Sequence, residues 1–202
     1  LIVMEKKADS KASNKHKASI TSKKKKTRSD STIIDQDEFR EFLGKATSIR
    51  DKLILAFFYE TGLNPSELSG LRVKDIDLKK RSINLRPDTT KNKKSRMIRM
   101  PRLLLVLLKS YIRSAKLDTE DFILFTRQSS QITSRRIEQI VKSISRKSGI
   151  KKGITPRNLR QSYIKNAFKN GMPEQEIRES TGTLTVRYKK HITESQYKLL
   201  VS

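Results

Sequence analysis

From about residue 33 onward, apolar residues recur mostly at the spacing of α-helices. Asp35 opens a DQDE stretch with capping-box spacing, and the apolar residues that follow it predict a first helix. The next apolar period, LILAFF, predicts a second helix that ends at Gly62. Asn64 and Pro65 have the character of an N-cap and a first helical residue, so a short third helix is expected there.

Alternation between residues 81 and 100 predicts two or three short strands, which would form the only sheet. The lysine-rich segment Lys91–Lys94 is expected at the hairpin tip. A leucine-rich helix follows over residues 101–112, and residues 122–125 should form a short buried strand or extended segment.

The second half of the chain is predicted to be helical. Ser134 is expected to cap one helix, and Thr155-Pro156 should open another that runs to about Lys169. Further helices are expected after Pro173 and over residues 193–201. The predicted fold class is therefore α+β and mainly α, with one core and a small antiparallel sheet.

The first 32 residues differ from the rest of the chain. They are rich in Lys, Ser and Ala and have no sustained apolar period, which predicts a disordered basic arm over 1–32 and a folded domain over 33–202. An expression leader or a solvated tail is the alternative, because Leu1 is not a start residue and Met4 could be.

The charge balance indicates a polyanionic partner. The 202 residues include 46 Lys and Arg against 21 Asp and Glu, a net charge of +25. Residues 1–32 carry ten of these cations and three of the acids, so residues 33–202 are themselves basic, with 36 cations and 18 acids. Because no apolar run approaches the ~20 residues of a spanning helix and no signal peptide is apparent, nucleic acid is favoured over a membrane.

Composition also limits the chemistry. The chain has no cysteine and two histidines, which excludes disulfides and Cys/His zinc sites. No acidic cluster suggests a carboxylate metal site, so neither a metal nor another cofactor is expected. An intracellular location fits this cysteine usage.

The segment ETGLNPSELSGLRVKDID, residues 60–77, resembles the first signature of the tyrosine recombinase and integrase family. In that family an arginine follows Thr-Gly-Leu, and here the position holds Asn64. The resemblance places Glu67 in the family's Ser-Glu-Leu, where we expect it to orient neighbouring basic groups. From the residues alone, Asn64 is a helix cap.

The hairpin segment TTKNKKSRMIRMP, residues 89–101, resembles the family's lysine-bearing hairpin turn. The resemblance implies that Lys91 protonates the leaving 5'-oxygen, a role that a lysine at a hairpin tip can fill. Lys93, Lys94 and Arg96 are expected to bind the DNA backbone.

The segment ITPRNLRQSYIKNAFKNG, residues 154–171, resembles the second signature. Arg160 takes the arginine position, and Arg157 stands where the family usually has histidine. Three residues apart in the first turns of one helix, the two could bracket a phosphate with help from the helix N-terminus. A basic helix face that binds phosphates without chemistry is the alternative.

The segment RESTGTLTVRYKKHI, residues 178–192, resembles the last signature less closely, with a spacer about four residues shorter than usual. Tyr188 is the expected nucleophile, with Tyr197 as the competitor in an apolar-periodic segment. Thr183 falls where the family has a second His or Trp. The remaining candidates are His191, which could substitute for a lost histidine, and the DNA-binding cations Arg187, Lys189 and Lys190.

The resemblance implies a compact helical tyrosine-recombinase catalytic domain that cuts and rejoins double-stranded DNA through a 3'-phosphotyrosyl link. It also implies dimers or tetramers on DNA and a DNA-associated location in the cytoplasm or nucleoid. Integration, transposition and site-specific resolution are not distinguished. The alternatives are a degenerate relative that only binds DNA and a general basic architectural protein.

Overall fold

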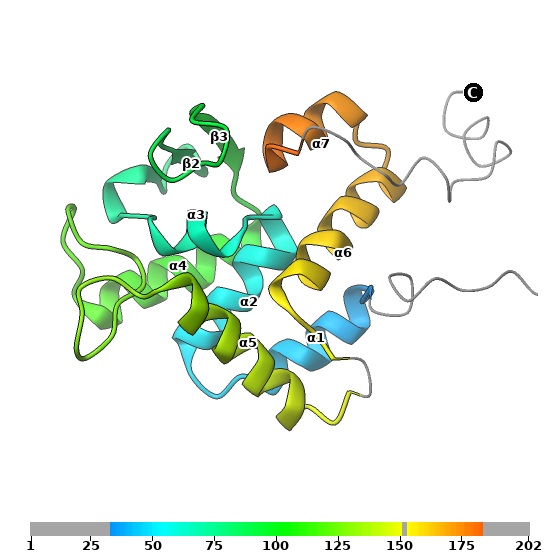
Figure 1. Ribbon diagram of the computed structural model, residues 1–202, viewed down its shortest axis with the longest axis horizontal. Coiled ribbons are helices and arrows are strands. Elements are labelled where there is room, and N and C mark those ends of the chain that lie inside the picture. Colours follow the sequence, from blue (N-terminus) through cyan, green and yellow to red (C-terminus); the bar gives the residue numbers. More distant parts are fainter. Residues whose placement is uncertain (1–32, 151–152, 184–202) are drawn as a thin grey trace, which may run out of the picture.

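The computed structural model describes residues 33–150 and 153–183, so the predicted arm and the predicted helix over 193–201 lie outside the described residues. Seven helices and three strands are described, and Figure 1 shows the helices gathered around α2. Within the described residues, no helix is long and apolar enough to cross a membrane. The elements are α1 (Gln36–Gly44), α2 (Ile49–Thr61), α3 (Pro65–Ser69), the 3-10 turn η2 (Val73–Asp75), β1 (Ile76–Asp77), β2 (Ser82–Leu85), β3 (Arg96–Arg99), α4 (Arg102–Ala115), α5 (Ser134–Lys147), α6 (Pro156–Lys169) and α7 (Glu174–Thr181).

Helix α2 is the centre of the core. Its residues from Leu53 to Tyr59 are all buried, and the helix packs against α1, α4, α5 and α6. A helix that is apolar on every side needs neighbours on every side, which these four helices provide. Burying each of Phe57 and Phe58 stabilises the fold by about 1.5–3 kcal/mol.

The predicted helix ends are mostly confirmed. Asp35 caps α1 with a full capping box, Gly62 ends α2 in the left-handed conformation, and Thr155 caps α6. The prediction that Ser134 caps α5 was wrong. Thr133 has the extended backbone of an N-cap and its side chain accepts the Arg136 amide, so Ser134 is the first helical residue.

The sheet is antiparallel in the order β1-β2-β3, with Ile83 paired to Ile76 on one side and to Ile98 on the other. Its first strand lies before the predicted range of 81–100, because two residues are too few to produce a visible alternation. Residues 122–125 do not form the predicted strand or extended segment, because Phe122 makes only an isolated bridge with Arg72, and Ile123 and Leu124 lie in a bend. Ile123 in this segment is buried, and its amide donates to the carbonyl of Leu71.

The last two described helices bring distant parts of the sequence together. Helix α6 runs along α2, and α7 packs against both α6 and β3 (Figure 1). A small apolar cluster of Ile164, Ala167 and Ile177 joins α6 to α7. The end of α2, the start of α3, strand β3, the first turns of α6 and the end of α7 therefore meet in one region.

Candidate active site

Asn64 acts as the N-cap of α3. Its Oδ1 accepts the backbone amide of Glu67 at 3.0 Å and the hydroxyl of Ser66 at 2.7 Å. In return, Oε2 of Glu67 accepts the Asn64 amide at 3.0 Å, which completes a capping box. The cap predicted from the sequence is confirmed, and the Asn64 side chain is directed at α3.

Glu67 is held in the interior, where it pairs with an arginine from the sheet. Its side chain is 2% exposed, and its Oε1 lies 2.8 Å from Nη1 of Arg96 on β3. Glu67 thus contacts a basic group, in keeping with the orienting role expected from its position. The pair joins α3 to β3 across 29 positions of sequence.

The side chain of Arg96 is largely buried. It is 10% exposed, and its Nε donates to the carbonyl of Ser180 at 3.0 Å, near the end of α7. Its Nη2 is buried and has no hydrogen-bond partner among the described residues. That Arg96 binds the DNA backbone together with Lys93 and Lys94 stays a prediction. Its tertiary contacts with Glu67 and Ser180 distinguish it from the exposed Lys93 and Lys94.

Arg160 projects from α6 toward the same region. Its Nη1 donates to the carbonyl of Gly62, and its Nη2 donates to the carbonyl of Thr181 and to the hydroxyl of Thr183, both at 2.8 Å. Burial lowers the pKa of the guanidinium, the carboxylate of Glu67 raises that pKa, and the positive charge of Arg96 lowers it. Arg96 thus pairs with Glu67, Arg160 is within the electrostatic influence of that carboxylate, and both guanidiniums donate to carbonyls in the last turn of α7.

Gly62 allows Arg160 and α6 to approach α2 closely. Its φ is 65°, and a Cβ added there would lie 2.5 Å from Cδ1 of Tyr163. Gly171 has a similar φ of 78° but open space around it.

We expect Gly62→Ala to lower the free energy of unfolding by about 2–4 kcal/mol, which combines left-handed strain with overpacking. Gly171→Ala should cost only about 1 kcal/mol, and urea unfolding of both variants measures the difference. Equal losses would show that the contact with Tyr163 is unimportant.

The lysines of the β2–β3 turn lie on the surface. Lys91, Lys93 and Lys94 are exposed, which confirms the predicted position of this segment at a hairpin tip. The turn is held from inside by the buried Thr90, whose hydroxyl donates to the carbonyl of Lys94 at 2.9 Å. A hollow of about 600 Å³ lies beside this turn, lined by Asn92, Gly182 and Thr183 among others. The turn is therefore close to the end of α7.

The two α6 arginines have different surroundings. Arg157 is exposed in the first turn of the helix, whereas Arg160 is partly buried and donates to three acceptors. That both bracket one phosphate stays a prediction. Tyr188, Tyr197, His191 and the cations Arg187, Lys189 and Lys190 lie outside the described residues, and Thr183 is the last described position before them. Residues 33–150 and 153–183 contain no group of three or more His, Cys, Asp or Glu that could hold a metal.

Comparison with known proteins identifies close sequence relatives. The profile of the phage integrase family matches residues 32–191. Tyrosine recombinase XerA of Pyrococcus furiosus is 33% identical over 136 residues, which are 66% of this chain and 46% of that protein. Tyrosine recombinase XerD of Listeria innocua is 26% identical over 180 residues, which are 82% of this chain and 60% of that protein. The chain thus spans about half the length of these relatives.

Solved structures share the fold. The crystal structure of XerA recombinase superposes with a TM-score of 0.72 at 24% identity, covering 83% of this chain and 63% of that one. XerH site-specific recombinase bound to its difH substrate has a TM-score of 0.68 at 19% identity, and the match covers 85% of this chain and 53% of that one. The Tn1549 transposon integrase in complex with transposon right-end DNA has a TM-score of 0.68 at 17% identity, and the match covers 83% of this chain and 64% of that one. The mainly helical fold with a small antiparallel sheet is confirmed.

Proposed function

We propose, because the chain belongs to the phage integrase family, that it cuts and rejoins double-stranded DNA through a 3'-phosphotyrosyl intermediate. The observation that carries the proposal is the cluster of Glu67, Arg96 and Arg160. These residues come from three separate elements and meet beside the end of α7, just before the segment that contains Tyr188. A largely buried cationic cluster, followed closely in sequence by a candidate nucleophile, fits the needs of phosphoryl transfer.

In the proposed reaction, the Tyr188 oxygen attacks the scissile phosphorus while the bond to the 5'-oxygen breaks. The tyrosine proton passes to water and the departing 5'-oxygen gains one from Lys91, so the cleaved strand ends in a 5'-hydroxyl. Arg160 stabilises the negative charge on the nonbridging oxygens, and Arg157 is a further donor from the same helix. Because the new phosphotyrosyl ester replaces the broken ester, rejoining is the reverse reaction.

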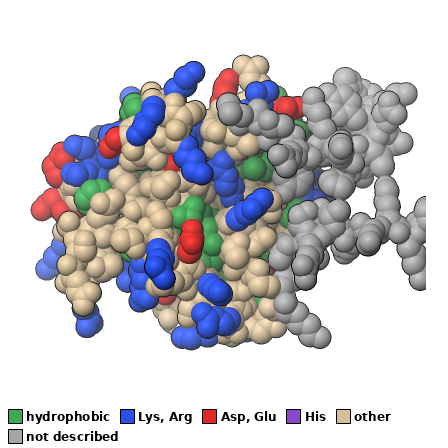
Figure 2. Space-filling model, in the orientation of Figure 1, with side chains coloured by type: hydrophobic (Ala, Val, Ile, Leu, Met, Phe, Trp, Pro, Cys, Tyr) green, Lys and Arg blue, Asp and Glu red, His purple; other side chains and the backbone are tan. Residues whose placement is uncertain are grey.

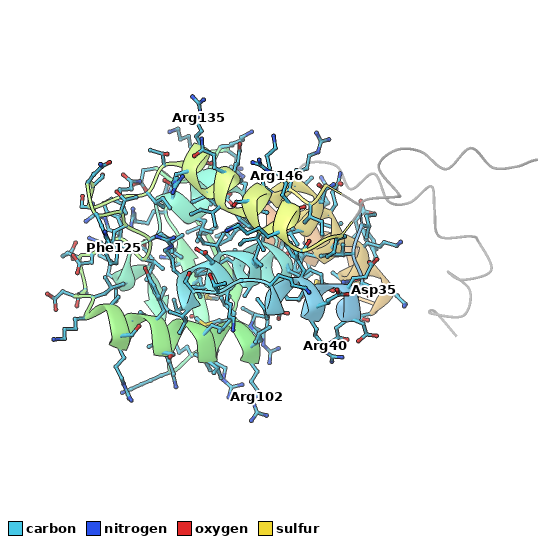
Figure 3. All side chains as sticks on the ribbon, turned by 90° about the horizontal axis from the view of Figure 1, so that it is seen from below. Asp35, Arg40, Arg102, Phe125, Arg135 and Arg146 are labelled. Atoms are coloured by element: carbon cyan, nitrogen blue, oxygen red, sulfur yellow. The ribbon has the colours of Figure 1, made fainter. Side chains whose placement is uncertain are left out.

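The surface charge supports DNA as the partner. Lys and Arg side chains are spread over the face in Figure 2, and Asp and Glu side chains are fewer there. In Figure 3, Arg135 and Arg146 extend outward from α5, on the side opposite to Arg40 and Arg102. Positive charge therefore extends over more than one side, as expected for a protein that contacts backbone phosphates over a wide surface. As part of the same proposal, the protein acts as a dimer or tetramer on DNA and is associated with DNA in the cell.

A binding module without catalysis is the second candidate, and Asn64 is the observation in its favour. The side chain that replaces the family's arginine is occupied with capping α3 and carries no charge. Removing one donor from a site that stabilises transition-state charge costs about 2.7–4 kcal/mol when nothing replaces it. The general architectural alternative loses its basis, because the match to the family profile is not a coincidence of composition.

The deciding experiment traps the covalent product. The full-length protein first selects its sites from a random duplex library. A selected site is then prepared as a series of duplexes, each nicked next to one candidate phosphate. Cleavage at that phosphate releases a short strand fragment that diffuses away, which prevents rejoining. We expect a protein-DNA adduct whose modified peptide, identified by mass spectrometry, contains Tyr188. A protein that binds the selected site tightly and forms no adduct at any nick position is a binding module.

A further inference from the structure

Arg96 supplies the positive charge beside Glu67 that the uncharged Asn64 does not. The family resemblance places an arginine at position 64, three residues before Glu67. The structure instead directs Asn64 at the α3 amides, and the cation beside Glu67 comes from β3. Arg157, which the sequence predicts to bracket a phosphate with Arg160, is exposed on α6.

The charges of the cluster do not cancel. Arg96 pairs with Glu67, and the charges of both influence the pKa of Arg160, so these two arginines and one carboxylate together carry a surplus positive charge of one. A buried surplus charge is costly unless it is paired and hydrogen-bonded. The cluster is therefore suited to receive an anion.

The hydrogen bonds of Arg96 also leave one nitrogen available. Nε is taken by the carbonyl of Ser180 and Nη1 by Glu67, whereas Nη2 has no acceptor among the described residues. Gly182 permits the close packing of α7 against this guanidinium, because a Cβ there would lie 3.0 Å from Nη1. An arginine fixed by two bonds, with its third nitrogen free, is preorganised to donate to one more oxygen.

We propose that Arg96 is the second guanidinium of the phosphate site and replaces in space the arginine that the sequence lacks at position 64. Nη2 donates to a nonbridging oxygen of the scissile phosphate beside Arg160, after DNA binding shifts the groups that cover it. Glu67 then serves to hold Arg96 in place. The inference rests on the proposed strand cleavage and adds a catalytic residue to it.

The test compares Arg96→Met with Arg99→Met, which removes one exposed cation three residues further along the same strand. The rate of adduct formation is measured on the selected, nicked site at saturating protein. We expect Arg96→Met to slow this step by about 10²–10³-fold, as expected for loss of a transition-state donor, and Arg99→Met by less than about 3-fold. Equal small losses in both variants would overturn the proposal.

A second substrate separates a phosphate contact from a purely structural role. A methylphosphonate at the scissile position replaces one charged nonbridging oxygen with a neutral methyl group, so the reaction needs one cation fewer. Relative to the unchanged protein, Arg96→Met should then be slower by less than about 10-fold. The same large deficit on both substrates would show that Arg96 only supports the fold.

Two controls keep the test decisive. Because Arg96→Met leaves the buried Glu67 unpaired, a variant that does not fold is replaced by Arg96→Met with Glu67→Gln, which removes both charges together. Asn64→Arg in the otherwise unchanged chain should leave the rate within about 3-fold, and a rise of about tenfold or more would show that the site lacked a cation. An unchanged protein that forms no adduct contradicts strand cleavage itself, whereas an active protein indifferent to Arg96→Met contradicts only this inference.

Discussion

Tyr188→Phe is expected to abolish the covalent protein-DNA adduct completely. Phenylalanine lacks the oxygen that attacks phosphorus, and no other part of the proposed site can form the ester in its place. Site binding should stay within about 2-fold, because the neighbouring cations Arg187, Lys189 and Lys190 still provide the electrostatic attraction. Gel separation of the denatured adduct measures cleavage, and fluorescence anisotropy measures binding of the same DNA.

The matched control is Tyr197→Phe, which removes the other candidate hydroxyl from the C-terminal segment. Adduct formation in this variant should stay within about 3-fold of the unchanged protein, because a tyrosine in an apolar-periodic segment contributes mainly packing. An adduct that persists in Tyr188→Phe and disappears in Tyr197→Phe would reverse the assignment of the nucleophile.

Arg160→Met is expected to reduce the rate of adduct formation by about 10²–10³-fold at saturating DNA, since it removes charge stabilisation at the phosphate. Arg160→Lys should recover only part of this loss, because an ammonium cannot reproduce the fork that binds the carbonyls of Gly62 and Thr181. Leaving those carbonyls without a donor should also destabilise the fold by about 1–3 kcal/mol for each one that stays buried. Thermal unfolding gives this part of the effect separately.

Lys165→Met serves as the control, since Lys165 is an exposed cation on the same helix and its replacement also removes one positive charge. Its cleavage rate should stay within about 3-fold of the unchanged protein. Arg160→Met could instead lose DNA affinity and keep an unchanged cleavage rate at saturating DNA. Arg160 would then be a binding residue rather than a catalytic one.

Most helices could be predicted because their ends are marked by local chemistry. The capping boxes at Asp35 and Asn64 and the glycine at position 62 act within a few residues of sequence, and the structure follows them. The errors occurred where local signals compete or are too short. Thr133 and Ser134 are both good caps, and their order is settled by which one takes the extended backbone.

Which residues belong to the candidate site was easier to predict than their burial and contacts. In sequence, Arg96 is one cation among several in a basic hairpin, and nothing in its spacing distinguishes it from the exposed Lys93 and Lys94. Its burial depends on Glu67 and on Ser180, which lies 84 positions away. Such contacts are tertiary and leave no periodic pattern. Glu67 and Arg160 could be selected as candidates because short motifs mark their positions, and their roles stay predictions.

The two carboxylate oxygens of Glu67 serve different partners, which links a helix cap to the chemistry. Oε2 accepts the amide of Asn64, and Oε1 holds Arg96. The first turn of α3 cannot open without releasing the Asn64 amide and disturbing the position of Arg96. Hydrogen exchange at this one amide should therefore report how rigidly the phosphate site is assembled, in the free protein and after DNA binding.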